Sequence, residues 1–365
     1  MLKKQFITVL FFILIAGHVF SQLSWPEITS ETKPWTRWWW PGSIVNQKDI
    51  SRVMEQYSSA GLGGLELTVI YGVKGQEEKF INFLSPEWMK MLSHTLNEAR
   101  RLGMGIDMAN ASSWPFGGPW VTDDDASKYV AFKSYVLKGG ESLKDRIEYI
   151  QEPFIRWNST YKEDIRGIKD PVYTNRNLQQ LAIDQIRFEK SIPLQALMAY
   201  SDDGKIIDLT GKVDNEGNLL WTAPAGNWTL YAVFMGWHGK MVERAGPGGE
   251  GYVIDHFSEQ AVKNYLSHFD RAFEGYDISY LRGFFNDSYE VDDARGQSDW
   301  TPSFFDEFLE RRGYDLREHL PALFQKDNPD KNARILMDYR LTISELILDN
   351  FTRGWSEWAH KQGKI

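Results

Sequence analysis

The residues best suited to acid–base chemistry follow a short apolar run. The run Tyr280–Phe285 (YLRGFF) leads directly into Asn286-Asp-Ser-Tyr-Glu290, so two carboxyl groups lie just beyond it. Hydrolysis of a glycosidic bond generally needs two carboxyl groups, one that donates a proton and one that activates water or attacks the anomeric carbon. Glu290 is a candidate for one of them. A surface glutamate or a helix-capping residue is the alternative interpretation.

The second segment that could take part in a reaction or in binding is an aromatic loop. Residues Asn110–Trp120 (NASSWPFGGPW) contain two Trp, one Phe, two Pro and two Gly. Such a segment is stiff and poorly suited to a regular helix or strand, so it could form a platform for a sugar ring. A rigid crossover into a following domain explains the same composition, and both interpretations stay open.

A glycine-rich segment is the third. Residues Glu243–Gly251 (ERAGPGGEG) contain four glycines, which let the backbone approach a ligand closely. The spacing does not match a phosphate-binding Walker loop, and Pro247 lacks a backbone donor. The segment is therefore either a structural turn or a loop that places Arg244, Glu250 and Asp255 in a sugar site.

Composition narrows the classes of function. The chain has no cysteine, which excludes disulfides, thiolate metal sites and a cysteine nucleophile. Its seven histidines form no HExxH pattern, and no Gly-x-Ser-x-Gly nucleophile motif occurs. Asp and Glu (50) outnumber Lys and Arg (41), so no basic surface for nucleic acid is expected. The 15 tryptophans favour a carbohydrate ligand, although core packing explains many of them singly.

The N-terminus predicts export. Two lysines precede an apolar stretch, residues 6–20, and small or polar residues follow it, which is typical of a signal peptide spanning residues 1–21. The stretch is shorter than the roughly 20 residues that span a bilayer, so no membrane anchor is predicted. We expect a periplasmic or secreted protein.

The elements that must position these residues alternate between strands and helices. We predict strands at Trp35–Trp40, Gly64–Tyr71, Gly105–Ala109 and Tyr280–Phe285, and helices at residues 47–60, 86–102, 258–273, 302–312 and 332–361. This rhythm is typical of a parallel β/α fold. A complete barrel has eight strand–helix units. The sequence thus predicts an α/β protein with a partial (β/α)8 TIM barrel of about four units, and the final residues, Gly363–Ile365, are predicted to begin a further strand.

The alternation is interrupted by a region of different character. Residues 128–236 show alternating runs at Tyr129–Leu137 and Trp228–Phe234, separated by turn pairs such as Gly139-Gly140 and Ala225-Gly226. We interpret them as an inserted antiparallel β domain. The first part of the barrel would then span residues 22–127. Its continuation would span 237–365 and end before the later strands.

Barrel active sites form where the strands end, because the βα loops converge there. Candidate substrate-binding residues are taken from the strand ends and from the glycine-rich segment. They are Arg37, Trp40, Glu66, Asp107, Asn110, Trp114, Arg244, Glu250, Asp255 and Asp287.

Four motifs in this order resemble glycoside hydrolase family 106, the α-L-rhamnosidases. They are Arg37–Gly42 (RWWWPG), Ser113–Trp120, Glu243–Gly251 with Asp255, and Asn286–Glu290. The resemblance covers nearly the whole chain after the signal peptide, and members of the family are much longer. It implies an inverting enzyme that releases terminal L-rhamnose from pectic or other complex glycans, built on a (β/α)8 barrel with β-rich accessory domains.

The resemblance also implies roles for residues and ions. Glu290 matches one catalytic glutamate, with a leaning towards general acid rather than base. The other glutamate would lie on a later strand outside these residues, so the chain alone is expected to be inactive. Calcium is implied as an ion that holds the sugar, although the sequence has no EF-hand spacing. A hydrolase for another deoxy sugar or for uronic-acid-rich pectin, and a non-catalytic carbohydrate-binding protein, remain the alternatives.

Overall fold

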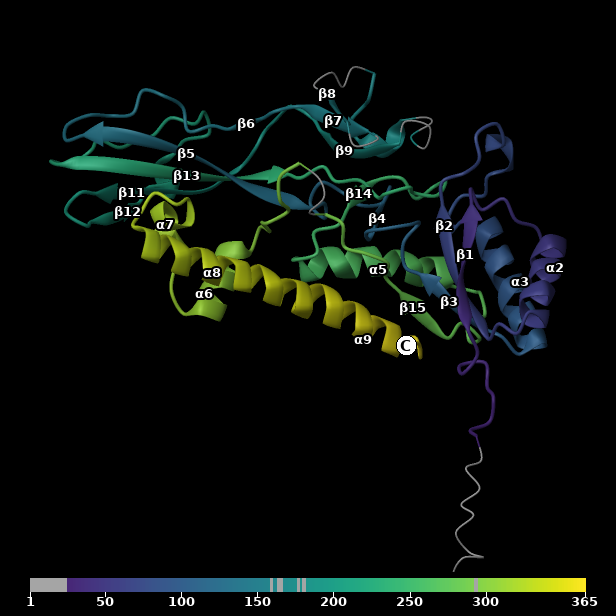
Figure 1. The fold of residues 1–365 in the computed structure, drawn as a ribbon. Coiled ribbons are helices and arrows are strands. Elements are labelled where there is room, and N and C mark those ends of the chain that lie inside the picture. Colours follow the sequence, from purple (N-terminus) through teal and green to yellow (C-terminus); the bar gives the residue numbers. More distant parts are fainter. Residues whose placement is uncertain (1–24, 158–159, 163–166, 176–177, 179–181, 292–294) are drawn as a thin grey trace, which may run out of the picture.

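Figure 1 shows the fold of the chain in a computed structural model. It describes residues 25–157, 160–162, 167–175, 178, 182–291 and 295–365. The predicted signal peptide, residues 1–21, lies outside the described residues. Within the described part of the chain, no helix is long and apolar enough to cross a membrane.

Four parallel strands form the sheet that carries the N-terminal motifs. They are β1 (Trp35–Pro41), β2 (Gly64–Ile70), β3 (Gly105–Ala109) and β15 (Gly283–Phe285), in the order β1-β2-β3-β15. β15 begins three residues later than predicted, because a turn precedes it, in which the Leu281 amide donates to the Ile278 carbonyl at 3.0 Å. The predicted parallel order is confirmed for these strands.

Helices cover one face of this sheet. α2 (Gln47–Ser59), α3 (Pro86–Leu102) and α5 (Glu259–Phe273) begin at the caps Asn46, Ser85 and Ser258, whose side chains accept backbone N–H groups of the first turn. α2 and α3 lie side by side outside β1 and β2 (Figure 1). Their buried faces and the sheet share one apolar core. A short 3₁₀ turn, η1 (Glu77–Lys79), lies between β2 and α3.

A second sheet is antiparallel and lies away from the first (Figure 1). It contains β5 (Lys128–Lys138), β11 (Leu194–Ser201), β12 (Ile206–Asp208) and β13 (Asn227–Trp237), in the order β12-β11-β13-β5. The turn pairs Gly139-Gly140 and Ala225-Gly226 lie at one end of the 11-residue β5–β13 pairing. Gly140 and Gly226 have positive φ. This sheet falls in the region predicted as an insertion. The division into domains itself stays a prediction.

Smaller antiparallel pairings complete the strand inventory of the described residues. β7 (Phe154–Trp157) pairs with β8 (Thr160–Lys162) and with β9 (Ile183–Arg187), and β6 (Ile150–Gln151) pairs with β10 (Lys190–Ser191). Two 3₁₀ turns, η2 (Val172–Thr174) and η3 (Thr210–Lys212), occur in the same region. β4 (Gly117–Gly118) pairs with β14 (Tyr252–Val253), which joins the aromatic loop to the segment that follows the glycine-rich loop.

Three of the C-terminal helices pack on the antiparallel sheet. α6 (Phe304–Arg312), the 3₁₀ turn η4 (Leu316–His319), α7 (Leu320–Leu323) and α8 (Pro329–Leu346) share an apolar cluster with the antiparallel sheet. The rings of Phe132 and Phe324 stack with centroids 3.8 Å apart. Within the segment predicted as a continuation of the barrel, the large apolar side chains of α6, α7 and α8 thus pack on one face of the antiparallel sheet.

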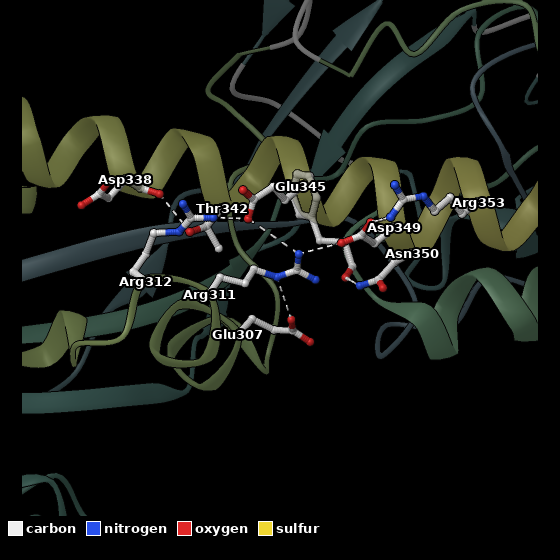
Figure 2. A network of polar contacts seen from close by, with 10 residues as sticks. Glu307, Arg311, Arg312, Asp338, Thr342, Glu345, Asp349, Asn350 and Arg353 are labelled. Carbon is white, nitrogen blue, oxygen red and sulfur yellow. Dashed lines mark hydrogen bonds and ion pairs between the residues drawn. The ribbon is translucent and has the colours of Figure 1, made fainter.

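One long helical segment joins the two sheets. α8 continues through the π-helical segment η5 (Ile347–Arg353) into α9 (Gly354–Lys361), which packs on α5 (Figure 1). An ion-pair network fixes α6 against it, as Figure 2 shows: Arg311 lies between Glu307, at 3.2 Å, and Asp349, at 2.7 Å. The network therefore holds α6 beside the junction of α8 and η5, where the helix changes from α to π geometry.

The last residue pairs with the parallel sheet. After Gly363, whose φ of +68° ends α9, the Ile365 amide donates to the Arg282 carbonyl at 3.2 Å and the Phe284 amide donates to the Ile365 carbonyl at 2.9 Å. The backbone of Ile365 thus pairs with the edge of β15, and the start of a further strand there stays a prediction. No closed barrel occurs among the described residues. The fold they show is a mixed α/β arrangement with an open parallel sheet.

Candidate active site

A row of charged side chains crosses the face of the parallel sheet that the helices leave open. Arg37, Glu66 and Asp107 occupy matching register positions on β1, β2 and β3, so their side chains project to the same side. The prediction placed these residues at the strand ends. They lie inside the strands instead, because each is the third residue of its strand.

Arg37 is the centre of one ion-pair group. Its Nη1 lies 2.7 Å from Asp287 Oδ2 and its Nε lies 3.6 Å from Glu66 Oε2. The guanidinium also stands over the rings of Trp39 and Phe285, with Cζ 5.2 and 5.0 Å from their centroids. Arg37 thereby ties the loop after β15 to β1 and β2.

Asp107 belongs to a separate pair. The Arg282 guanidinium binds it with both Nε, 3.0 Å from Oδ1, and Nη2 to Oδ2. This bidentate contact and Coulomb attraction to Asp107 raise the pKa of Arg282 above its usual value. The ion pair with Arg282 provides a counter-charge for Asp107, which is largely buried.

Glu290 is held by two hydrogen-bond donors from different segments. Trp114 Nε1 donates to Oε2 at 2.6 Å, and the Ser288 hydroxyl donates to Oε1 at 2.8 Å. Glu290 has φ of +21° and Ser113, beside Trp114, has φ of +154°, a region that L residues rarely adopt. Such strained backbone clusters at functional sites, where surrounding contacts maintain it.

The aromatic loop is itself anchored. The Glu243 amide donates to the Trp114 carbonyl at 2.7 Å, and β4 pairs with β14 just beyond. Phe116 is fully buried and packs on Tyr265 with centroids 5.0 Å apart. Of the loop's aromatic rings, the partly exposed Trp114 is the one that reaches Glu290, so the loop combines a core anchor with a contact at the candidate site.

A pocket of about 500 Å³ opens beside this loop. Its lining includes Tyr71, which follows β2, and Glu243, Arg244 and Glu250 from the glycine-rich segment. The Arg244 Cζ lies 6.0 Å from the centroid of Trp114. Glu290 does not line the pocket, but Trp114 connects the two, since it contacts both Arg244 and Glu290.

Comparison with known proteins decides the family. The family model described as alpha-L-rhamnosidase, glycoside hydrolase family 106, matches residues 27–183 and 182–364. The chain belongs to glycoside hydrolase family 106. The resemblance drawn from the four motifs is confirmed.

Individual relatives agree with this family at different levels. A putative β-glucuronidase from Formosa agariphila is 26% identical over 97% of this chain and 32% of its own length. A rhamnosidase structure from Novosphingobium sp. PP1Y has a TM-score of 0.66 at 18% identity, covering 93% of this chain and 46% of that chain. The second comparison shows a shared fold. This family 106 chain spans about a third to a half of the proteins it matches.

Three candidate substrate-binding residues of the family 106 chain are buried in its core, which corrects their predicted role. Trp40, Asn110 and Asp255 have no exposed surface. Trp40 points towards the helices and packs edge-on to Trp88, because alternate side chains of β1 face opposite sides of the sheet. The Asn110 side chain accepts from Trp355 Nε1 at 2.9 Å and its carbonyl accepts from Tyr265. These two residues hold helices to the sheet.

Asp255 has an electrostatic role in the interior. Burial raises its pKa to about 6, and the Lys128 ammonium and hydrogen bonds counteract this only partly. Lys128 is buried too, and its Nζ donates to the carbonyls of Asp124 and Ala126, both at 2.7 Å. The neighbouring His256 has its pKa lowered to about 3 by burial. These groups lie where β5 leaves the parallel part of the fold.

The calcium expected of the family has no ligand set in the part of the chain that the structure describes. Among those residues, no group of three or more His, Cys, Asp or Glu side chains is placed to hold a metal ion. The acidic side chains of the open face are instead paired with Arg37 and Arg282. We therefore assign no residue to calcium, and its involvement stays a prediction.

Two contact residues were missed by sequence reasoning. Arg282, which neutralises Asp107, is a cation inside the apolar run YLRGFF, and that mismatch was the available signal. Ser288 lies within the motif used to choose Glu290, but a serine two residues before a glutamate carries no recognisable signal. Its role depends on the tight backbone turn at Glu290.

Proposed function

We propose that this chain forms part of a glycoside hydrolase that releases terminal L-rhamnose from complex glycans, with Glu290 as one of its two catalytic carboxyl groups. The observation that carries the proposal is the Trp114–Glu290 hydrogen bond of 2.6 Å, which holds a carboxyl group on the loop after a parallel strand. Active sites of β/α folds form at that end of the strands. Family membership supports the reaction class.

The geometry favours Glu290 over the other carboxyl groups of the open face. Asp287 and Glu66 share the Arg37 guanidinium, and Asp107 is bound by Arg282. These ion pairs give the three carboxyl groups partners within the sheet and its loops. Glu290 is hydrogen-bonded by neutral donors only, Trp114 and Ser288. We infer that Glu290, which is outside these ion pairs, is the catalytic carboxyl group of this chain, and that the second one lies outside it.

We infer that the parallel sheet belongs to a (β/α)8 barrel, which agrees with the same proposal. The open parallel sheet, helices on one face and the pairing of Ile365 beside β15 are what an incomplete barrel would present. The chain by itself would then be inactive. The predicted signal peptide supports export to the periplasm or the medium.

The test is sugar release by the full-length protein. Rhamnose-capped pectic oligosaccharides are incubated with the unmodified protein, with Glu290→Gln, and with Glu310→Gln, an exposed glutamate on α6 as the matched control. We expect the unmodified protein and Glu310→Gln to release rhamnose, and Glu290→Gln to lose about 10²- to 10⁴-fold of the rate, the usual contribution of a general acid or base.

Other results would point to the alternatives. Release of a different monosaccharide, a uronic acid above all, would favour the second candidate, a related hydrolase. The name of the Formosa agariphila relative, putative β-glucuronidase, is the reason for testing release of a uronic acid. Oligosaccharide binding without any release, unaffected by Glu290→Gln, would leave a carbohydrate-binding protein and remove the catalytic proposal.

A further inference from the structure

The pocket beside Trp114 contains a cation with no acidic partner among the described residues. Asp184 on its wall faces the Arg156 guanidinium at 3.5 Å, and Glu243 is paired with Lys240. Glu250 also has a polar or charged contact. Arg244, by contrast, forms no ion pair with any carboxylate in the described part of the chain, and its recorded side-chain contact is the Trp114 ring.

The backbone at Arg244 is constrained to present this side chain. Its φ of +50° lies in the left-handed region, which non-glycine residues avoid at a cost. The conformation is fixed from both sides, because the Tyr71 amide donates to the Arg244 carbonyl at 2.9 Å and the preceding Glu243 amide donates to the Trp114 carbonyl. The pocket therefore has Arg244 and Tyr71 on its wall, and the Arg244 Cζ lies 6.0 Å from the centroid of Trp114, which is outside the lining.

From this arrangement we propose that the pocket is a subsite for a uronic acid unit of the glycan, with Arg244 binding its carboxylate. A guanidinium matches a carboxylate through two parallel N–H···O bonds. The aromatic ring of Tyr71, in the lining, suits the C–H face of a sugar ring, and a volume of about 500 Å³ lies in the range of small-ligand sites. The inference rests on the proposed glycosidase function, since it names the glycan unit next to the bond being cleaved.

The position of the pocket relative to Glu290 fits a neighbouring sugar unit. Trp114 contacts Arg244 through its ring and Glu290 through its N–H, so a single side chain separates the pocket from the candidate acid. The pocket itself does not contain Glu290. A sugar bound there would thus lie beside the reacting unit rather than at its anomeric carbon.

The experiment compares two substrates that differ only in the carboxylate. A rhamnosyl-uronic acid disaccharide and its carboxyl-reduced derivative are given to the full-length protein, to Arg244→Met and to Arg244→Lys, with Arg334→Met on α8 as an exposed control. We expect Arg244→Met to lower kcat/KM at least tenfold on the acidic substrate, mainly through KM, and less than twofold on the reduced one. Arg244→Lys should keep part of the preference, and Arg334→Met should match the unmodified protein.

A binding measurement separates failure of the subsite from failure of the proposed function. Calorimetric titration of Glu290→Gln with each disaccharide requires no turnover, and we expect tighter, salt-sensitive binding of the acidic one that Arg244→Met abolishes. Equal hydrolysis and equal binding of the two disaccharides would overturn the uronate subsite and leave the hydrolase. Arg244-dependent binding of the acidic disaccharide without hydrolysis by any form would keep the subsite and remove the hydrolase. Thermal melts confirm that each variant is folded.

Discussion

The indole N–H of Trp114 donates to the Glu290 carboxylate at 2.6 Å across 176 positions of sequence. It joins the aromatic loop after β3 to the acidic loop after β15, two neighbouring strands of the parallel sheet. Because the loop's Phe116 is fixed in the core, the contact gives Glu290 a rigid partner. A carboxyl group that must meet a glycosidic oxygen benefits from such fixed geometry.

Trp114→Phe is expected to lower kcat for rhamnose release about 10- to 100-fold with little change in KM. The substitution keeps an aromatic ring but removes the N–H donor, and leaving a partly buried oxygen without its partner costs about 1–3 kcal/mol. Initial rates of the full-length protein measure it over a range of pH, because a change in Glu290 geometry should also alter the pH profile. Trp25→Phe, at a residue 93% exposed, is the control. An unchanged kcat would remove the positioning role of Trp114.

Trp40→Phe should reduce stability and leave substrate binding intact. Trp40 is fully buried against Trp38 and Trp88, so the smaller ring opens a cavity costing about 1–3 kcal/mol. Trp39 is the preceding residue, lies on the opposite face of the sheet and is 40% exposed. Trp39→Phe should therefore change stability by less than about 0.5 kcal/mol. Denaturant unfolding and KM are measured for both. A raised KM for Trp40→Phe at unchanged stability would restore its predicted role in sugar binding.

Asp255→Asn should remove part of the pH dependence of stability. The pKa of Asp255 in the folded protein, about 6, lies above the usual value of 3.8, so folding favours the neutral acid. Stability from this group is full below about pH 4 and is lost as pH rises through 6, by on the order of 3 kcal/mol. His256 acts in the opposite direction, since its lowered pKa costs stability as pH falls below 6.5. Comparing the variant with the unmodified protein cancels the His256 contribution.

Unfolding free energies at pH 4.5 and 7.5 provide the measurement. When the pH rises from 4.5 to 7.5, the Asp255 contribution should lower the unfolding free energy of the unmodified protein. Asp255→Asn should lack this decrease. Asp145→Asn, at an exposed aspartate, serves as the control and should follow the unmodified protein. Parallel curves for all three proteins would show that Asp255 is ionised at both pH values.

Local elements could be read from the sequence because their determinants are local. Asn46, Ser85 and Ser258 cap the helices they precede, and α3, β3 and the end of α5 match the predicted bounds. Hydrogen-bonding side chains at a helix start and a glycine such as Gly103 at its end act within a few residues of chain. The family followed from four such short motifs in order, and Glu290 followed from its place after a strand.

Only the tertiary structure decided which residues meet and which face each strand buries. The sequence WTRWWW does not distinguish Trp40, enclosed by helices, from Trp39, which faces the open side, since strand pairing and helix docking choose the face. Likewise, α6 to α8 follow the β/α rhythm in sequence yet pack on the antiparallel sheet. Burial and long-range hydrogen bonds depend on surfaces that folding brings together from distant parts of the chain. The Trp114–Glu290 contact therefore had no signal in the sequence, although each partner did.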